Sequence, residues 1–251
     1  MNRIVFILFF VSATYLMSAQ TTEIKPLPER ITLSPITDID GNSYPVIRIG
    51  TQVWMAAHLK TQRLWDGTPL TNRAGLETFS SEEPSYCYLD NQRDLGLTLG
   101  FLYNYAVVNT GKICPKGWHV PSNTEWKVLE EYLVSNGYGY TGKPGNIGIA
   151  KALASTVMWN FTSAIGCPGS TDYPGRRNAT GFNALPSSRR GCTGPQYDLP
   201  NQSAYWWTST QNGITDRLGG VWIKYIWYNH YALRTESRSA YDGYSIRCIR
   251  D

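Results

Sequence analysis

The stretch that decides the fold runs from Cys114 to Trp126 and reads CPKGWHVPSNTEW. Within it, Ser122 stands three residues before Glu125, the spacing of a capping box, in which the serine hydroxyl accepts from the first turn and the glutamate reaches back. A helix is therefore predicted to begin here. Apolar side chains then recur at the spacing of one helix face, and Asn136-Gly137 supplies a stop. The members of that face are Trp126, Leu129, Tyr132 and Leu133.

The N-terminal end has the pattern of a secretory signal peptide. Arg3 precedes a short apolar run from Ile4 to Met17, and small residues follow. The run is too short for a membrane anchor, so we expect residues 1–19 to be removed after Ala19 and the chain to be exported. This expectation covers the periplasm, the outer surface and the medium alike. Loss of Arg3 lowers the formal net charge from +4 to +3, which does not indicate nucleic-acid binding.

The remaining chain divides into a leader and one domain. Residues 20–37 are polar, contain three prolines and have no periodic pattern, so an extended leader is predicted. Residues 38–251 are enough to form a single domain. The segments Tyr44–Ile49 and Gln52–Met55 indicate the two strands of a hairpin. A second helix is predicted over Ile147–Val157.

One segment invites comparison with a calcium loop. Asp38–Asn42 places acidic and amide oxygens at alternate positions, which suits that ion. Its glycine, Gly41, comes too early, and Ile49 stands where the bidentate glutamate belongs. We therefore expect a turn that opens a hairpin. With three histidines and no C-x-x-C pair, we also expect no metal site and no cofactor.

The cysteines predict disulfides, one of them across the longest irregular segment. Five cysteines in an exported chain favour disulfides, and the odd number leaves at least one unpaired. Between Trp159 and Pro200 the sequence is rich in Gly, Pro, Arg and Ser without a period, and loops of this length tend to be functional or stapled. Because Cys167 and Cys192 bracket this loop, we expect a bond between them. Whether Cys87 is free stays open.

The clearest sheet pattern lies near the C-terminus. Four β-branched and aromatic segments, separated by turn signals, predict an antiparallel meander. In the second segment alternation creates two faces, and the face that carries Trp222 and Lys224 is predicted to be the wetter one. The four segments are Tyr205–Thr210, Gly220–Trp227, His230–Arg234 and Tyr244–Ile249.

Aromatic side chains also indicate a recognition surface. Nine tryptophans and seventeen tyrosines are more than a core of this size needs to hide. Flat rings stack on sugar rings or peptide side chains, and arginine or histidine adds directional hydrogen bonds. The alternative is a sheet whose outer face is merely rich in tyrosine. The candidate ligand-binding residues are Trp222, Lys224, Trp227, Tyr228, His230, Tyr231 and Arg234.

Two classes of function fit these features. The first is an exported, non-enzymatic binding or adhesion module that recognises a glycan or a protein. The second is an enzyme that acts on an extracellular polymer through loop carboxylates. General acid–base catalysis needs two carboxyls at a defined separation, which no spacing here shows, so no catalytic residue is assigned. His119 is interpreted as a packed histidine, since no carboxylate adjoins it in the sequence. The carboxylates considered are Asp172, Asp198, Asp216 and Glu236.

Several segments, taken in order, carry a family resemblance. They are Asp40–Asn42, Ile49–Met55, Asp66–Pro69, Tyr86–Tyr88, Leu102–Ala106, Cys114–Pro121, Gly181–Pro186, Tyr205–Thr210 and Ser245–Asp251. Together they resemble the Fibrobacter succinogenes major paralogous domain, a family of exported bacterial proteins that is similar to the C-type lectin fold. The resemblance implies an α+β, C-type-lectin-like domain with two helices, a small antiparallel sheet and a long irregular loop region that binds ligands. It also implies a disulfide between Cys114 and Cys248.

The resemblance does not extend to the known chemistry of that fold. Sugar-binding lectins hold calcium with Glu-Pro-Asn or Gln-Pro-Asp in the long loop and Trp-Asn-Asp in the next strand. Neither set is present, and Glu83-Pro84-Ser85 lies upstream of the first helix. Formylglycine-generating enzymes share an ending like Ser245–Cys248, but they need a pair of redox-active cysteines there. Cys248 is the only cysteine in the corresponding C-terminal segment of this sequence, so the redox-active pair is missing.

Overall fold

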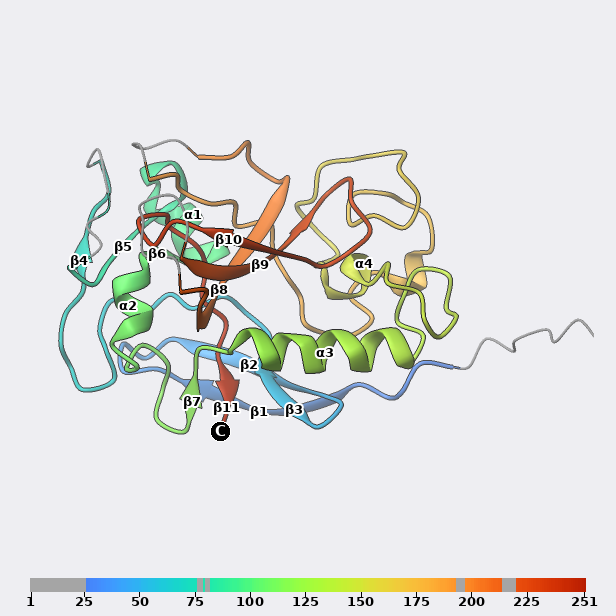
Figure 1. Cartoon of the computed structure of the whole chain (residues 1–251), viewed down its shortest axis with the longest axis horizontal. Helices are drawn as coiled ribbons and strands as arrows, with labels where there is room; N and C mark the ends of the chain where they lie inside the picture. Colours follow the sequence, from blue (N-terminus) through green and yellow to red (C-terminus); the bar gives the residue numbers. More distant parts are fainter. Residues whose placement is uncertain (1–25, 76–78, 80–81, 193–196, 214–219) are drawn as a thin grey trace, which may run out of the picture.

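A computed structural model describes residues 26–75, 79, 82–192, 197–213 and 220–251 (Figure 1). The expected signal peptide, residues 1–19, lies outside the described residues. Within the described ranges the chain forms a mixed α+β structure with three small sheets. None of the helices in these ranges is long and apolar enough to cross a bilayer.

The largest sheet has five strands in the order β1-β2-β3-β11-β7 and joins both ends of the chain. The predicted hairpin is confirmed as β2 and β3. Part of the expected leader is strand β1, which pairs antiparallel with β2 at the sheet edge. On the far side Ile249 pairs with both Trp54 and His119. The strands are β1 (Ile31–Thr37), β2 (Ser43–Ile49), β3 (Gln52–Met55), β7 (Trp118–His119) and β11 (Ile249–Arg250).

A second sheet has the order β10-β9-β8 and is antiparallel throughout, as the predicted meander requires. It comprises β8 (Ser203–Gln211), β9 (Val221–Trp227) and β10 (Arg234–Arg238). The third strand begins where the predicted one ends. The reason is a turn, in which the His230 amide donates to the Trp227 carbonyl and the Ala232 amide donates to the His230 ring.

The fourth predicted strand does not belong to this meander, which corrects the prediction. Tyr244 forms a bridge with Tyr103, and the Ser245 carbonyl accepts from the Trp207 amide. The chain therefore crosses the end of the meander before Ile249 joins the five-stranded sheet.

The third sheet is small and has the order β4-β5-β6. Short helical segments surround it. The Asn104 side chain caps one of them by accepting from the Val107 amide, which is why the strand before it ends at Tyr103. The elements are β4 (Thr71–Asn72), β5 (Ser85–Cys87), a 3-10 turn (Leu89–Asn91), α1 (Arg93–Leu99), β6 (Leu102–Tyr103) and α2 (Tyr105–Asn109).

Helix α3 (Asn123–Ser135) confirms the predicted capping box. The Ser122 hydroxyl accepts from the Glu125 amide at 3.2 Å, and the Glu125 carboxylate accepts from the Ser122 amide at 2.7 Å. Figure 1 shows α3 between strands β1–β3 and strands β8–β10. The ring of its buried Trp126 has its centroid 4.9 Å from that of Trp54 in the first sheet and 5.4 Å from that of Trp206 in the second. The helix thereby joins the two sheets into one core.

The second predicted helix is shorter than expected. Helix α4 covers only Ala150–Leu153, because Ala154 leaves it to form a bridge with Ala184. The described part of the long segment that follows is irregular, as predicted, apart from a 3-10 turn at Pro174–Arg176 and a few isolated β-bridges.

The disulfide implied by the resemblance, Cys114–Cys248, is present. The predicted bond between Cys167 and Cys192 is not formed, and both are free thiols. Their surroundings differ: Cys167 lies near Asp172, whereas Cys192 interacts with Asp242. The two thiols therefore have different neighbours, one within the loop and one outside it.

Cys87 is the third free thiol in the described part of the chain, and it is fully buried. Burial raises the pKa of this thiol to about 11. It is therefore protonated and unreactive near neutral pH.

Candidate ligand-binding site

The β10-β9-β8 sheet carries a pocket of about 270 Å³ beside the turn that connects β9 to β10. Three of the seven predicted ligand-binding residues line it: Trp227, His230 and Arg234. The full lining is Tyr205, Tyr225, Trp227, Asn229, His230, Arg234, Glu236 and Arg238.

Strand register explains the floor of this pocket. Tyr225 of β9 is aligned with Tyr205 on one side and with Arg234 on the other. The two tyrosine rings stack with centroids 5.2 Å apart, and the Arg234 guanidinium carbon lies 5.9 Å from the Tyr225 centroid. Alternation places Trp227 on the same face as Tyr225. The result is an aromatic floor with a cation at its edge.

A chain of hydrogen bonds holds the floor in place. The Trp227 indole donates to the Tyr205 oxygen at 2.9 Å, and the Tyr205 hydroxyl donates to Asp198 at 2.9 Å. Asp198 also accepts from Arg189 at 3.0 Å. Burial, followed by the negative charge of Asp198, raises the pKa of Tyr205 well above its usual value. The Tyr205 phenol therefore stays protonated and continues to donate its hydrogen bond to Asp198.

The remaining lining residues supply charge and N–H donors. Glu236 and Arg238 form an ion pair at 2.9 Å, with both side chains more than a third exposed, so the pair adds little stability. Because the His230 Nδ1 accepts from the Ala232 amide at 3.2 Å, the neutral ring carries its hydrogen on Nε2. Arg234 is exposed. Counting Glu236, Arg234 and Arg238, the charged lining has a net charge of +1.

The face of β9 that was predicted to be wetter is covered instead. Ile226 is fully buried there, and Lys224 is only 3% exposed. The Lys224 ammonium donates to Thr235 Oγ1 at 2.6 Å and lies 3.6 Å from the Glu130 carboxylate of α3. Helix α3 thus covers the face predicted to meet ligand.

The other predicted residues also lie outside the pocket lining. Trp222 is half-buried, on the same face as Lys224. The Tyr228 side chain is half-buried, and its amide donates to the Gln202 carbonyl. Tyr231 is exposed, and its ring stacks on His230 with centroids 5.0 Å apart.

The three candidate carboxylates within the described residues have separate surroundings. Asp172 accepts from the buried Lys151 ammonium, which also donates to Ser170. Asp198 is engaged by Tyr205 and Arg189, as described above. Only Glu236 lines the pocket, whereas Asp216 lies outside the described residues. The described pocket therefore presents one carboxylate, while general acid–base hydrolysis uses two.

His119 differs from the sequence-based interpretation. Folding brings two carboxylates to it, with Asp251 Oδ1 2.6 Å from Nδ1 and Glu125 Oε1 2.8 Å from Nε2. Partial burial alone would lower the pKa of His119, but the hydrogen bonds to Asp251 and Glu125 outweigh that effect and raise it. The histidine joins β7 to the end of the chain and to the capping box.

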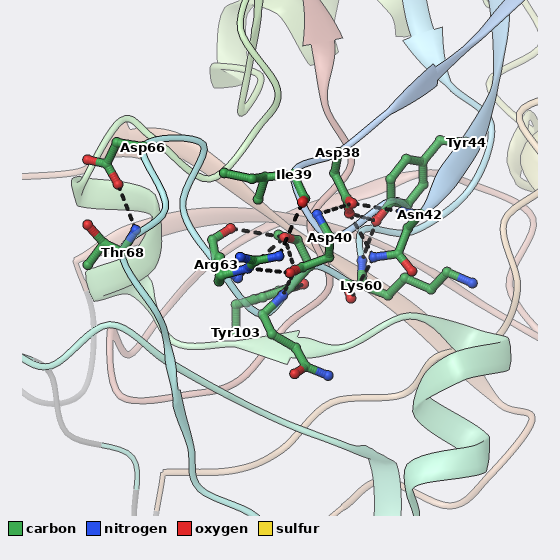
Figure 2. A network of polar contacts seen from close by, with 12 residues as sticks. Asp38, Ile39, Asp40, Asn42, Tyr44, Lys60, Arg63, Asp66, Thr68 and Tyr103 are labelled. Carbon is green, nitrogen blue, oxygen red and sulfur yellow. Dashed lines mark hydrogen bonds and ion pairs between the residues drawn. The ribbon is translucent and has the colours of Figure 1, made fainter.

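The turn at Asp38–Asn42 is a hydrogen-bonded turn, as predicted (Figure 2). The Asp38 Oδ1 accepts from the amides of Asp40 and Asn42, both at 2.9 Å, and Oδ2 accepts from the Tyr44 hydroxyl at 2.5 Å. Asp40 in turn accepts from Arg63 at 2.6 Å. In the described ranges, no three His, Cys, Asp or Glu side chains are grouped as metal ligands.

Two of the missed lining residues, Tyr205 and Tyr225, carried a usable signal. Both are aromatic residues in predicted strands, and alternation alone puts Tyr225 beside Trp227. Asn229, Glu236 and Arg238 gave no comparable signal, because their place depends on where the β9–β10 turn ends.

These observations define a mixed α+β domain with an aromatic, cationic pocket at the end of a small sheet. The chain belongs to the Fibrobacter succinogenes major domain family, whose model matches residues 47–250. The resemblance predicted from the sequence motifs is thus confirmed at the level of the family. Comparison with curated proteins and with solved structures gave no match. The Cys114–Cys248 bond indicates an oxidising, extracytoplasmic setting.

Proposed function

We propose that this protein is an exported, non-enzymatic binding module that recognises a glycan through the pocket on the β10-β9-β8 sheet. The observation that carries the proposal is the stacked Tyr205–Tyr225 floor flanked by Trp227 and Arg234. Membership of a family that is similar to the C-type lectin fold is a second support, because the long irregular loop region binds ligands in that fold and Asp198 of the corresponding loop here accepts from Tyr205 of the pocket. The proposed setting is the bacterial cell surface, the periplasm or the medium, where the protein would serve adhesion.

The chemistry of the lining suits a sugar. The apolar C–H face of a sugar ring can stack on Tyr225 and Trp227, which are half-buried, and Arg234 and His230 can donate to its oxygens. A pocket of about 270 Å³ lies just below the usual range for small-ligand sites, which favours the terminal residue of a chain. Because the charged lining is positive on balance, we propose a glycan that carries a carboxylate. Arginine binds such a group through two parallel N–H bonds.

A glycan array of neutral and acidic oligosaccharides tests this proposal. We expect the purified protein to bind acidic glycans, and Arg234→Gln to bind them about tenfold more weakly, as loss of a charge-assisted contact implies. Arg250→Gln is the matched control, since Arg250 is exposed on β11 and does not line the pocket. A blank array, or equal binding by the wild type and Arg234→Gln, would refute the proposal. A blank array would leave a protein ligand as the better hypothesis.

A further inference from the structure

A row of aromatic rings leads from the pocket on the β10-β9-β8 sheet to the long irregular loop. His230, which lines the pocket, stacks on Tyr231 with ring centroids 5.0 Å apart. Tyr231 meets Tyr140 edge to face with centroids 6.2 Å apart, and the Tyr140 centroid lies 5.5 Å from that of Tyr173. These three tyrosines lie outside the pocket lining. The row therefore extends the aromatic surface beyond the pocket.

The tyrosines of the row are accessible from solvent. Tyr231 is 40% exposed and Tyr173 is 44% exposed, and Tyr140 between them is half-buried. Within the described ranges, none of the three phenol hydroxyls forms a hydrogen bond to the protein. Exposed aromatic side chains that adjoin a pocket are typical of a binding surface. Each ring offers a ligand an apolar face and a hydroxyl that both donates and accepts.

Backbone hydrogen bonds hold the β9–β10 turn against neighbouring segments. The Tyr231 carbonyl accepts from the Ala150 amide of α4 at 2.9 Å. The Tyr228 carbonyl accepts from the Gly169 amide of the long loop at 2.7 Å. Figure 1 shows this turn beside α4. Because the turn and the long loop are joined, a ligand that binds across both orders little additional chain.

The middle and the end of the row are also fixed. The Tyr140 ring packs against Gly148 and Gly166, and a side chain at either glycine would collide with it. Gly166 belongs to the long loop, so this contact joins the loop to Tyr140. Tyr173 has a backbone φ of 42°, in the left-handed region that bulky residues rarely adopt. Residues held in such a conformation are concentrated at functional sites, including ligand sites.

We propose that this row binds the continuation of the glycan whose terminal residue occupies the pocket, so that the ligand is an acidic oligosaccharide. This inference rests on the proposed function. Since the volume of the pocket favours one terminal residue, the residues that follow must lie outside it. A chain that leaves the pocket past His230 meets Tyr231 and then Tyr173. The C–H faces of its sugar rings pack on these rings, and its hydroxyls bond to the phenols.

The dependence of affinity on chain length tests the inference. The probes are galacturonic acid and mannuronic acid, each as the monosaccharide and as the linear tetrasaccharide. Calorimetry measures the tetrasaccharide directly and the monosaccharide by displacement of the tetrasaccharide. We expect at least one tetrasaccharide to bind about tenfold or more tightly than its monosaccharide, as additional aromatic contacts imply.

The two ways of failing are distinct. A tetrasaccharide that binds no more tightly than its monosaccharide overturns the inference and leaves the proposed pocket in place. Absence of binding by all four probes overturns the inference together with the acidic-glycan proposal on which it rests.

Variants locate the additional contacts. Tyr231→Ala and Tyr173→Ala are each expected to weaken tetrasaccharide binding by about fivefold and to leave monosaccharide binding within about twofold of the wild type. Ile31→Ala removes a side chain of similar exposure, 47%, on β1 of the five-stranded sheet. This control is expected to bind both probes like the wild type.

The variant at Tyr173 decides the outcome if Tyr231→Ala disturbs the β9–β10 turn, because Tyr173 does not belong to that turn. Unchanged tetrasaccharide binding by Tyr173→Ala places the remaining sugars elsewhere. An equal loss of both probes in that variant shows an effect on the pocket instead of the row. Either result overturns the inference.

Discussion

The Trp227 indole donates a hydrogen bond to the phenol oxygen of Tyr205 at 2.9 Å, across the β8–β9 pair. The same phenol donates to Asp198, which belongs to the long irregular loop and also accepts from Arg189. The aromatic floor of the pocket on the β10-β9-β8 sheet is therefore fixed by the loop as well as by the sheet.

This relationship predicts the effect of Tyr205→Phe. The variant keeps the ring but leaves the Trp227 N–H and one Asp198 oxygen without their partner. We expect the free energy of unfolding to fall by about 1–3 kcal/mol, the usual cost of orphaned polar groups. Urea unfolding measures this value. Tyr231→Phe, at an exposed position, is the control and should stay within about 0.5 kcal/mol of the wild type. If Tyr205→Phe also stays within that range, the hydrogen-bond chain does not stabilise the fold.

The capping box predicts a structural role for Ser122. Replacing Ser122 by alanine removes the hydroxyl that accepts from the Glu125 amide. We expect a loss of about 1 kcal/mol in the free energy of unfolding and an unchanged affinity for ligand. Thr124→Ala, at an exposed position in the first turn, is the matched control. A changed affinity with unchanged stability would show that this segment belongs to the binding site.

The disulfide predicts a larger effect. Cys114 and Cys248 are 134 residues apart in the sequence, so their bond restricts a long loop of the unfolded chain. We expect the double variant Cys114→Ala/Cys248→Ala to lose about 2–5 kcal/mol. A reducing agent should lower the Tm of the wild type and leave that of the double variant unchanged. A wild type whose Tm is insensitive to reduction would contradict this expectation.

His119 predicts a pH dependence of stability. Both ring nitrogens face carboxylate oxygens, and both can donate only when the ring is protonated. Since the pKa of His119 is raised on folding, the stabilisation is complete below the unfolded value of about 6.5. It is lost as the pH rises through the folded value.

The size and test of this effect follow from exposure. The His119 side chain is 39% exposed, so we expect a contribution of at most about 1 kcal/mol. Urea unfolding of the wild type and of His119→Gln at about pH 6 and about pH 8.5 measures it, because these values bracket the titration. The stability difference between the two proteins should shrink at the higher pH. An equal difference at both values would exclude a titrating His119.

Local signals predicted much of the fold. The β2–β3 hairpin, the capped helix α3 and strands β8 and β9 each depend on neighbouring residues, and each was found in the sequence. Contacts between distant segments were not predicted. Alternation placed Lys224 on one face of β9, but the sequence did not show that Glu130 and the rest of α3 cover that face.

The candidate site was predicted in part for the same reason. Trp227, His230 and Arg234 were identified, while Tyr205 and Tyr225 were not. The pocket depends on the cross-strand register and on the length of the β9–β10 turn. Neither could be predicted from the residue pattern of a single strand. Likewise, Cys167 and Cys192 bracket a loop in the sequence, but bracketing says nothing of the distance between them.

The most direct test of the glycan-binding proposal is the affinity of the best array ligand for the wild type, Trp227→Ala and Trp222→Ala, measured by calorimetry on variants shown to be folded. The two tryptophans lie on opposite faces of β9, and only Trp227 lines the pocket. We predict that Trp227→Ala weakens binding by about tenfold or more, the effect of losing a central aromatic contact. Trp222→Ala should stay within about twofold of the wild type, since peripheral changes cost little. Unchanged binding by Trp227→Ala, or an equal loss in both variants, would contradict a glycan site in this pocket.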